Sequence, residues 1–522
     1  MTDTGAPLVD APDPPGSAGP PAAAPLGSGT VVAMAGIAVL AVFNSFWRLG
    51  TADWKIDESL DGAYAWEAVR HGTWGLEDGH PVAIRWFMGL GQLAFGQGRW
   101  GIRVSGALAS VAAVWLLYLV GKRLHSRTAG LAAAAMWAAL PRALVLGHET
   151  VGPLRADRFG YLEPFMVVAL LGATLTGWNW IQHTRMRDAV ATGLLIGTAT
   201  AFKPTAIVVV VPVVAMAIWR RRSVGPVLGG AAVIAALAVV VLPLTYLPLG
   251  TTGPGHLRTL IDYQLDHART GHFLVVDGKL IDHEARYSHL LYQWRGMGWA
   301  ACTGLLIGIV GAWVGRRRRS IDYVTAILVS LLGFHLLSTV ALPHYYILWA
   351  PFSVLLASMG LVELARRGAP SRPPGDAAAA PSPVGADLVG RGRRAPGATT
   401  AVVIATVLLA GSGLAATVAT ANLQPGDYAR LTDDLDAAGV HPAAVRYQGE
   451  AVDRYFPHAV SGQIGFTDAS APFDLLVLDA RDVPLLPAGT ADEVRAMARS
   501  EGLVVHHVGR LEVWYADPGG GT

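Results

Sequence analysis

The stretch AVATGLLIGTATAFKPTAIVVVVPVVAMAIWR, residues 189–220, decides the fold. It holds two apolar runs, residues 189–202 and 204–219, that meet at Lys203. A helix that crosses a bilayer needs roughly 20 apolar residues, so each run is short for a span. The stretch forms either one interrupted span or two helices that turn near Lys203. The other apolar runs and the charges of the chain distinguish these alternatives.

The composition is that of a protein with several membrane spans. Of the 522 residues, 52% are hydrophobic and 15% are charged, whereas a soluble protein carries about 25% charged residues. The deficit comes from long apolar runs that a bilayer accepts. With the two short runs counted separately there are about eleven candidate spans, namely residues 30–47, 104–120, 129–146, 161–181, 189–202, 204–219, 227–247, 299–314, 323–342, 346–364 and 400–421.

The positions of the basic residues test this number of spans, because short loops rich in Lys and Arg stay on the cytoplasmic side. With the N-terminus inside, eleven spans place every basic cluster on that side. Merging the two short runs would move residues 220–222 outside, so the charges favour two helices. The clusters are Lys122/Arg123/Arg127, Arg185/Arg187, residues 220–222, residues 316–319 and Arg366/Arg367.

The sequence therefore predicts an all-α polytopic membrane protein with a small C-terminal extracytoplasmic α/β domain, in the plasma membrane of a bacterium. The two segments rich in Pro, Ala and Gly bury too little apolar surface to fold. The predicted parts are a disordered cytoplasmic tail (1–29), a transmembrane domain (30–364) with outer loops at 48–103, 147–160 and 248–298, a disordered cytoplasmic linker (365–399), a last span (400–421) and the outer domain (422–522). Within the first outer loop, residues 82–97 predict an interfacial or re-entrant helix.

Several classes of function are disfavoured at this stage. The formal net charge of +2 gives no general affinity for nucleic acid. The single cysteine, Cys302, excludes a disulfide within the chain and argues against a thiolate metal cluster. The sequence has no Gly-rich phosphate loop.

Carboxylates collect directly after the first span. Asp57 and Glu58 are adjacent, and Asp61 shares a helix face with Asp57 at i, i+4. Like charges held close together raise the pKa of one of them, which suits a general base. The alternative is a solvated loop in which Asp57 caps a helix, and the spacing alone favours that alternative.

The second outer loop carries Arg155 and Arg158, which oppose the positive-inside rule, and Glu163 at the mouth of a span. A charge there is costly without a function or a partner. The alternative is an ion-pair cluster that includes Asp157. For Lys203 the two alternatives are a functional intramembrane lysine and a side chain that extends to the outer interface.

Histidines mark the later outer segments. His272 lies in the loop 248–298 and can help to form a polar pocket, although nothing there has a metal-ligand spacing such as H-E-x-x-H. His344 lies in the last outer turn, beside two tyrosines that fit an interfacial aromatic belt.

Four segments together resemble a known family. They are Asp57-Glu58 after the first span, Gly79-His80-Pro81 before an apolar helix, the segment from Arg158 to Glu163-Pro164, and Lys203-Pro204; the stretch that begins at Pro343-His344 is a weaker fifth. Their order and shared outer location resemble the polyprenyl-phosphate-dependent GT-C glycosyltransferases. Within that group the chain is most similar to the protein O-mannosyltransferases and the aminoarabinose lipid A transferases.

The resemblance implies a GT-C fold and an inverting transfer of a sugar from a polyprenyl-phosphate donor, on the outer face, to a hydroxyl of a protein, glycan or lipid acceptor. It implies no required cofactor and no metal ligands, while leaving room for a divalent cation. The implied roles are Asp57 and Glu58 in catalysis, Arg158, Lys203 and Arg155 at the donor phosphate, and His80, Glu163, Asp61, His272 and His344 at the substrates.

The chain departs from the family pattern in places. Glu163 stands where the family has Asp, which leaves its role open, and Gly-His-Pro-Val replaces a doubled proline. Two other readings stand beside the transferase. One is a transporter or flippase of lipid-linked substrates, which usually shows repeat symmetry that this chain lacks. The other is a non-catalytic scaffold of the cell envelope.

Overall fold

The protein is described by a computed structural model that covers residues 28–74, 79–146, 149–220, 225–271, 274–276, 279–281, 286–314, 318–368, 396–449, 451–464 and 472–516. Most of the predicted tail and linker lie outside these residues. At both ends of the predicted linker the structure is helical, because one helix runs to Gly368 and the next begins at Pro396.

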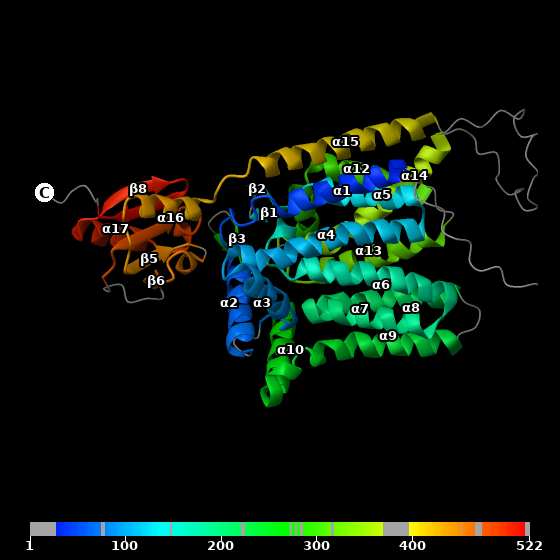
Figure 1. Ribbon diagram of the computed structural model, residues 1–522, viewed down its shortest axis with the longest axis horizontal. Helices are drawn as coiled ribbons and strands as arrows, with labels where there is room; N and C mark the ends of the chain where they lie inside the picture. The colour runs from blue at the N-terminus through cyan, green and yellow to red at the C-terminus, as the bar shows by residue number, and fades with distance from the viewer. Residues whose placement is uncertain are drawn as a thin grey trace, which may run out of the picture.

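A bundle of helices that run side by side forms the main body (Figure 1). Each of the eleven predicted apolar segments overlaps one of these helices. They are α1 (Ser28–Phe46), α4 (Arg99–Leu124), α5 (Arg127–Ala139), α6 (Glu163–His183), α7 (Met186–Phe202), α8 (Val210–Arg220), α9 (Gly225–Leu244), α12 (Trp299–Val314), α13 (Arg319–Leu337), α14 (Ala350–Gly368) and α15 (Pro396–Ala421).

The number of apolar spans is smaller than the predicted eleven. Within the described residues, six helices are long and apolar enough to cross a membrane, and these are α1, α4, α6, α9, α13 and α15. A seventh is added if α11 (Ser288–Met297) and α12, bent by 110°, count as one span. The chain is thus a multi-pass membrane protein, while crossing by the shorter helices and the sidedness of the bundle stay predictions.

The predicted span 129–146 is wrong in its second half. Helix α5 ends at Ala139, and Leu140 has extended backbone angles because Pro141 follows it. The chain then forms β1 (Ala143–Leu146), which pairs antiparallel with β2 (Glu149–Arg155). The turn at Lys203 is present: α7 ends at Phe202, and after extended Lys203 the chain continues through the 3-10 helix η2 (Pro204–Val209) into α8.

Three helices lie across one end of the bundle: α2 (Ile56–His71), α3 (Ala83–Phe95) and α10 (Gly253–Thr270) (Figure 1). Helix α3 exposes Trp86, Leu90 and Leu93, which share a face at i, i+4 and i+7. This is the arrangement expected of the interfacial helix predicted at residues 82–97. The outer loop 248–298 also holds α11 and a short hairpin, β3 (Leu274–Val276) and β4 (Lys279–Ile281), none of which the sequence predicted.

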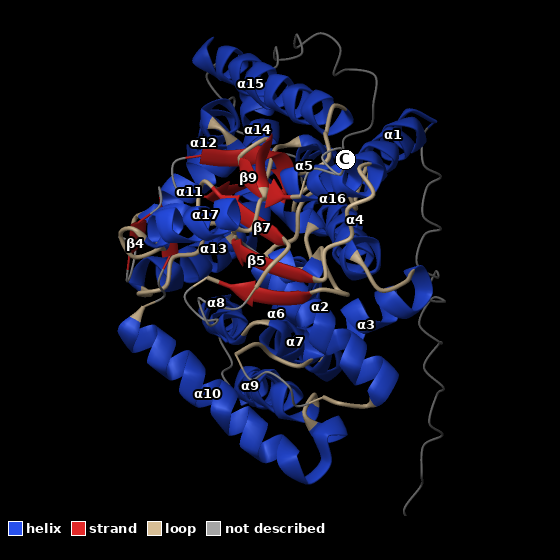
Figure 2. Ribbon diagram, turned by 90° about the vertical axis from the view of Figure 1, so that its left-hand side faces the viewer, coloured by secondary structure: helices blue, strands red, loops and turns tan. Residues whose placement is uncertain are grey.

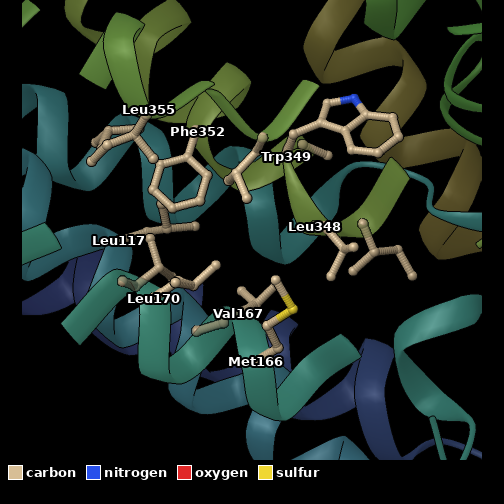
Figure 3. Packing of buried hydrophobic residues seen from close by; sticks show 14 of the residues in the cluster. Leu117, Met166, Val167, Leu170, Leu348, Trp349, Phe352 and Leu355 are labelled. Carbon is tan, nitrogen blue, oxygen red and sulfur yellow. The ribbon is translucent and has the colours of Figure 1, made fainter. Parts of the chain in front are cut away.

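Packing in the hydrophobic core positions the N-terminus of α6, where Glu163 lies. Met166, Val167 and Leu170 of α6 pack with Leu117 of α4. They also pack with four residues around the start of α14, namely Leu348, Trp349, Phe352 and Leu355 (Figure 3). All are buried. The N-terminus of α6 is therefore held beside the 3-10 helix η4 (Tyr345–Leu348), which brings Glu163 next to His344 and Tyr345.

The C-terminal domain is a five-stranded mixed sheet between two helices (Figure 2). The strand order is β6-β5-β7-β9-β8. Helix α16 (Asp427–Ala437) packs on one face and α17 (Thr490–Ser500) on the other. The predicted small α/β domain is confirmed, with two strands that the sequence did not predict, β5 and β6. The strands are β5 (Ala444–Gln448), β6 (Val460–Gln463), β7 (Leu475–Asp479), β8 (Val504–Val508) and β9 (Leu511–Tyr515).

The two ends of the bundle differ in charge. Helices α4, α8 and α14 end, and α13 begins, with arginines or lysine at the end that faces away from the C-terminal domain (Figure 1). The opposite end carries α2, α3 and α10 together with the predicted site residues.

Candidate functional site

Three of the predicted residues meet at the N-terminus of α6. The Glu163 carboxylate forms an ion pair with Lys203 Nζ and lies 3.3 Å from Nε2 of His344. Both contacts use Oε1 of Glu163. All three side chains are buried, with Glu163 only 1% exposed. Segments that are far apart in the sequence thus converge on one carboxylate.

Aromatic rings hold this group in place. The His344 imidazole stacks on Tyr161, with ring centroids 4.6 Å apart and planes at 12°. Lys203 Nζ lies 3.5 Å from the centroid of the Tyr345 ring. A cation over an aromatic face gains about 2 kcal/mol when water is excluded. The rings therefore fix both the position of Lys203 and the plane of His344.

A second pair lies between α2 and the loop before α3. Nδ1 of His80 is 3.0 Å from Oδ2 of Asp61, and Asp61 is 2% exposed. The pKa of His80 is raised to about 9: burial lowers it, but the Asp61 and Asp57 carboxylates outweigh that effect, while Lys203 opposes them. His80 is accordingly an imidazolium at neutral pH.

Asp57 links the two pairs. It lies one helical turn before Asp61 on α2 and is partly exposed. Its charge acts on both His80 and Tyr345, and so does the charge of Lys203. Asp57 and the buried Lys203 therefore have His80 and Tyr345 as common neighbours. We treat these residues as one polar site at the end of the bundle.

Glu58 has different surroundings from Asp57. It is fully buried, its Oε2 accepts hydrogen bonds from Nε of Arg103 (2.9 Å) and the backbone N–H of Gly160 (3.0 Å), and Oε1 accepts from the N–H of Lys55 (3.1 Å). Lys55, rather than Asp57, is the N-cap of α2, and Glu58 at N3 accepts from the N-cap N–H as the N3 glutamate of a capping box does. The arrangement ties the start of α2 to α4 and to the loop after η1 (Ala156–Arg158).

Arg155 lies in a buried ionic cluster at the end of α5. Oδ2 of Asp157 accepts hydrogen bonds from Arg142 (2.8 Å), Arg155 (3.1 Å) and the Ser110 hydroxyl (2.6 Å). Nη1 of Arg155 also donates to the Ala138 carbonyl at 2.9 Å. The C-terminal carbonyls of a helix lack partners within the helix. Arg155 and Arg142 donate to the last carbonyls of α5. Their pairing with Asp157 corresponds to the ion-pair alternative that the sequence left open for this loop.

Arg158 lies beside that cluster. Its Nη2 donates to the carbonyl of Trp47, at the end of α1, and its charged neighbours are Arg155, Arg103 and Asp157. Its Nη1 is buried and has no hydrogen-bond partner among the described residues. The same loop donates from Gly160 to Glu58 on α2. Arg158 is thus held against the end of α1, two residues before the backbone N–H that contacts α2, and it keeps one buried donor without a partner among the described residues.

Sequence reasoning missed three residues of this region. Arg103 and Arg142 are fully buried arginines, and Tyr345 was assigned only to the interfacial belt. Both arginines lie at the outer ends of predicted spans, where the positive-inside rule makes them unusual, so a signal was present. His272 lies outside the described residues. Among the residues that the structure describes, no three His, Cys, Asp or Glu side chains are grouped to hold a metal ion.

The first comparison concerns family. Residues 79–246 match the family model described as dolichyl-phosphate-mannose-protein mannosyltransferase. The matched segment contains His80, Arg155, Arg158, Glu163 and Lys203. The predicted resemblance to polyprenyl-phosphate-dependent GT-C glycosyltransferases is confirmed.

Individual relatives agree with this. Two curated proteins of Pseudomonas fluorescens, both named undecaprenyl phosphate-alpha-4-amino-4-deoxy-L-arabinose arabinosyl transferase 1, are 26% identical to the chain. The protein of strain Pf0-1 matches over 206 residues, 36% of this chain and 34% of its own length. That of strain Pf-5 matches over 326 residues, 59% of this chain and 56% of its own length. The chain therefore spans between a third and three fifths of these relatives.

The fold is shared more widely than the sequence. The crystal structure of ArnT from Cupriavidus metallidurans bound to undecaprenyl phosphate superimposes with a TM-score of 0.57 at 16% identity, over 95% of this chain and 100% of that one. Likeness at this level of identity establishes the fold. It covers both the helical bundle and the C-terminal domain.

Proposed function

We propose that this chain, whose residues 79–246 match the family model of dolichyl-phosphate-mannose-protein mannosyltransferases, transfers a sugar from a polyprenyl-phosphate donor to an acceptor hydroxyl at the end of the bundle that carries the C-terminal domain. One observation carries the proposal. Lys203 pairs with Glu163 over the Tyr345 ring, and Asp57 lies one helical turn from the Asp61–His80 pair, so a candidate phosphate cation and a candidate base lie at the same end of the bundle.

Asp57 is the carboxylate best suited to act as the base. Glu58, Asp61 and Glu163 are all buried, with exposed fractions of 0%, 2% and 1%. Asp57 is partly exposed on the same helix. A base must reach the proton that it removes, which requires an accessible carboxylate. We therefore assign the first step to Asp57 and assign Glu58 to positioning α2.

The reaction is one displacement. Asp57 takes the proton of the acceptor hydroxyl while the hydroxyl oxygen forms a bond to the anomeric carbon of the donor sugar. The bond from that carbon to the phosphate oxygen breaks, and its electron pair stays on the phosphate. Attack from the face opposite the leaving group inverts the anomeric configuration.

The leaving phosphate gains negative charge, which fixed cations stabilise. The charge of Lys203 is shared with Glu163, so Lys203 does not suffice by itself. His80 adds an imidazolium, and Arg158 adds a guanidinium whose Nη1 has no partner among the described residues. An arginine can bind phosphate with two parallel hydrogen bonds. These cations, from three different segments, form the proposed phosphate site.

The test is a donor screen with purified protein and defined polyprenyl-phosphate sugars, followed by the variant Asp57→Asn. Loss of a general base typically lowers the rate by about 10²- to 10⁴-fold, and we expect a loss in that range with the thermal unfolding temperature unchanged. Asp433→Asn, which changes an exposed carboxylate of α16, is the matched control. Full transfer by Asp57→Asn would remove Asp57 from the mechanism. An anomeric configuration retained in the product would exclude single displacement.

A further inference from the structure

One residue of the membrane domain, Asp53, acts as a helix cap for the C-terminal domain. Helix α16 begins at Asp427, its N-cap is Gly426, and no side chain within the helix caps it. Oδ1 of Asp53, from the loop after α1, accepts a hydrogen bond from the backbone N–H of Ala429 at 3.4 Å. Ala429 is the N3 position, whose N–H an N-cap side chain normally satisfies. Gly426 has no side chain to cap the helix, and Asp53 of the membrane domain supplies the missing cap.

The absence of a side chain at residue 426 makes this contact possible. A Cβ built on Gly426 would lie 2.1–2.5 Å from the carboxylate of Asp53. The Gly426 N–H also donates to the Thr51 carbonyl at 3.0 Å, so two backbones meet there. The negative charge of Asp53 is further favoured by the positive end of the α16 dipole.

Other groups of the C-terminal domain hold the same loop. The Tyr455 hydroxyl lies 3.2 Å from Oδ1 of Asp53 and accepts from the N–H of Trp54 at 2.7 Å. Arg510 lies 3.5 Å from Oδ2 of Asp53 and also pairs with Asp427 at 2.7 Å. Asp53 is thus bound through both carboxylate oxygens.

The loop is held from its other side by the membrane domain. Arg103 donates to the carbonyls of Leu49 (3.1 Å), Ala52 (3.0 Å) and Asp53 (2.8 Å), and it pairs with Glu58. The segment 49–55 therefore lies between α4 and the C-terminal domain, and α2 starts from it at Ile56. Asp57 is the second residue of that helix, four positions after Asp53.

We propose that Asp53 is a positioning residue, which caps α16 across the domain boundary and thereby couples the C-terminal domain to the start of α2, where Asp57 lies. The consequence for catalysis rests on the proposed function. Displacing a reacting group by about 1 Å can cost about 100-fold in rate, so losing this contact lowers the turnover number while the donor site at Lys203 keeps its affinity.

Two variants of the full-length protein remove the contact in different ways. Asp53→Ala deletes the cap. Gly426→Ala removes no functional group, but its added Cβ forces the Asp53 carboxylate aside. Asp53→Asn is the rescue variant, because Asn is as good an N-cap as Asp. Asp433→Ala, an exposed carboxylate of α16, and Gly411→Ala, where an added Cβ meets nothing within 4 Å, are the matched controls.

The experiment measures kcat and donor KM, together with amide hydrogen exchange of residues 49–57, for protein in lipid nanodiscs. For Asp53→Ala and Gly426→Ala we expect kcat to fall at least about tenfold with KM within about threefold, and exchange to speed up over the same residues. Asp53→Asn and both controls should stay near the parent protein.

Unchanged kcat and unchanged exchange in both variants would overturn the coupling. An equal loss in Asp53→Asn would overturn the capping role, since a cap survives that change. If the parent protein transfers no sugar from any donor, the proposed function fails while the exchange measurement still decides the coupling. Faster exchange in Asp53→Ala and Gly426→Ala would then support the contact, and unchanged exchange would reject it.

Discussion

Asp57 and Glu58 are neighbours in the chain, yet the first turn of α2 gives them opposite surroundings. Glu58 points into the protein, where Arg103 and two backbone N–H groups use its oxygens, while Asp57 stays accessible. The adjacent carboxylates that suggested one acidic centre thus divide into a candidate base and a helix cap. The burial of each side chain, and not the residue type, separates the two roles.

His80 gives a pH prediction at the same scale. Its pKa is raised from an ordinary value of 6.5 to about 9, through Asp61 and Asp57 and against Lys203. A raised pKa means that the imidazolium stabilises the folded protein fully below pH 6.5, and that this stabilisation is lost as the pH rises through 9. Sugar transfer should decline over the same alkaline range as the cation disappears.

The measurement compares the parent protein with His80→Gln. Thermal unfolding should show a stability difference between the two that is largest below pH 6.5, shrinks as the pH rises towards about 9 and is absent above that value. The alkaline limb of the pH–rate profile should flatten in the variant. A stability difference that stays constant across this range would show that His80 is not the titrating group.

At the scale of elements, the buried pair of Glu58 and Arg103 joins α2 to α4. Both side chains are at most 1% exposed, and their contact spans 45 positions of sequence. Removing one partner of a buried ion pair typically costs about 3–5 kcal/mol, because the other charge stays buried. We expect Glu58→Gln and Arg103→Met each to destabilise the protein by about that amount, measured by thermal or chemical unfolding in detergent.

The double variant tests whether the pair is the cause. Because the two residues are in contact, the loss in Glu58→Gln/Arg103→Met should be smaller than the sum of the single losses. Glu67→Gln, a partly exposed residue of the same helix, should change stability little. Strict additivity of the two single effects would show that they act through separate contacts.

The sequence predicted these elements unevenly, for a physical reason. Apolar runs are local, so the position of each bundle helix could be predicted from them. Where a helix ends depends on single residues, and Pro141 shortened α5. Pairings are not local: Glu163 meets Lys203 across 40 positions, and the sequence singled out both residues without indicating that they pair.

For the whole molecule, the sequence predicted that the basic clusters gather at one end of the bundle. It did not predict how the C-terminal domain contacts the membrane domain. Charge asymmetry is a property of composition, so the basic clusters could be assigned to one end. The contact of Asp53 with Ala429 crosses 376 positions and depends on a glycine that contributes no side chain. Nothing in the pattern around residue 426 indicates a partner that far away in the sequence.

The sidedness of the membrane domain gives the last prediction. The active-site proposal places the end that carries α2 and the C-terminal domain away from the cytoplasm, in agreement with the basic clusters at the opposite ends of α4, α8, α13 and α14. Single cysteines placed in a Cys302→Ser background report this directly. We expect a membrane-impermeant maleimide to label Asp433→Cys in intact spheroplasts, and to label Arg367→Cys only after the membrane is broken.

Asp433 is exposed and Arg367 is partly exposed, so the reagent can reach both once the membrane does not separate them. Cys302 is partly buried in α12, and its replacement removes background labelling. The two positions also check each other, because α15 is the one bundle helix between them among the residues that the structure describes. If both cysteines were labelled from the same side, α15 would not cross the membrane. If the pattern were reversed, Asp57, Lys203 and Arg158 would face the cytoplasm, and the donor would have to present its sugar phosphate on that side.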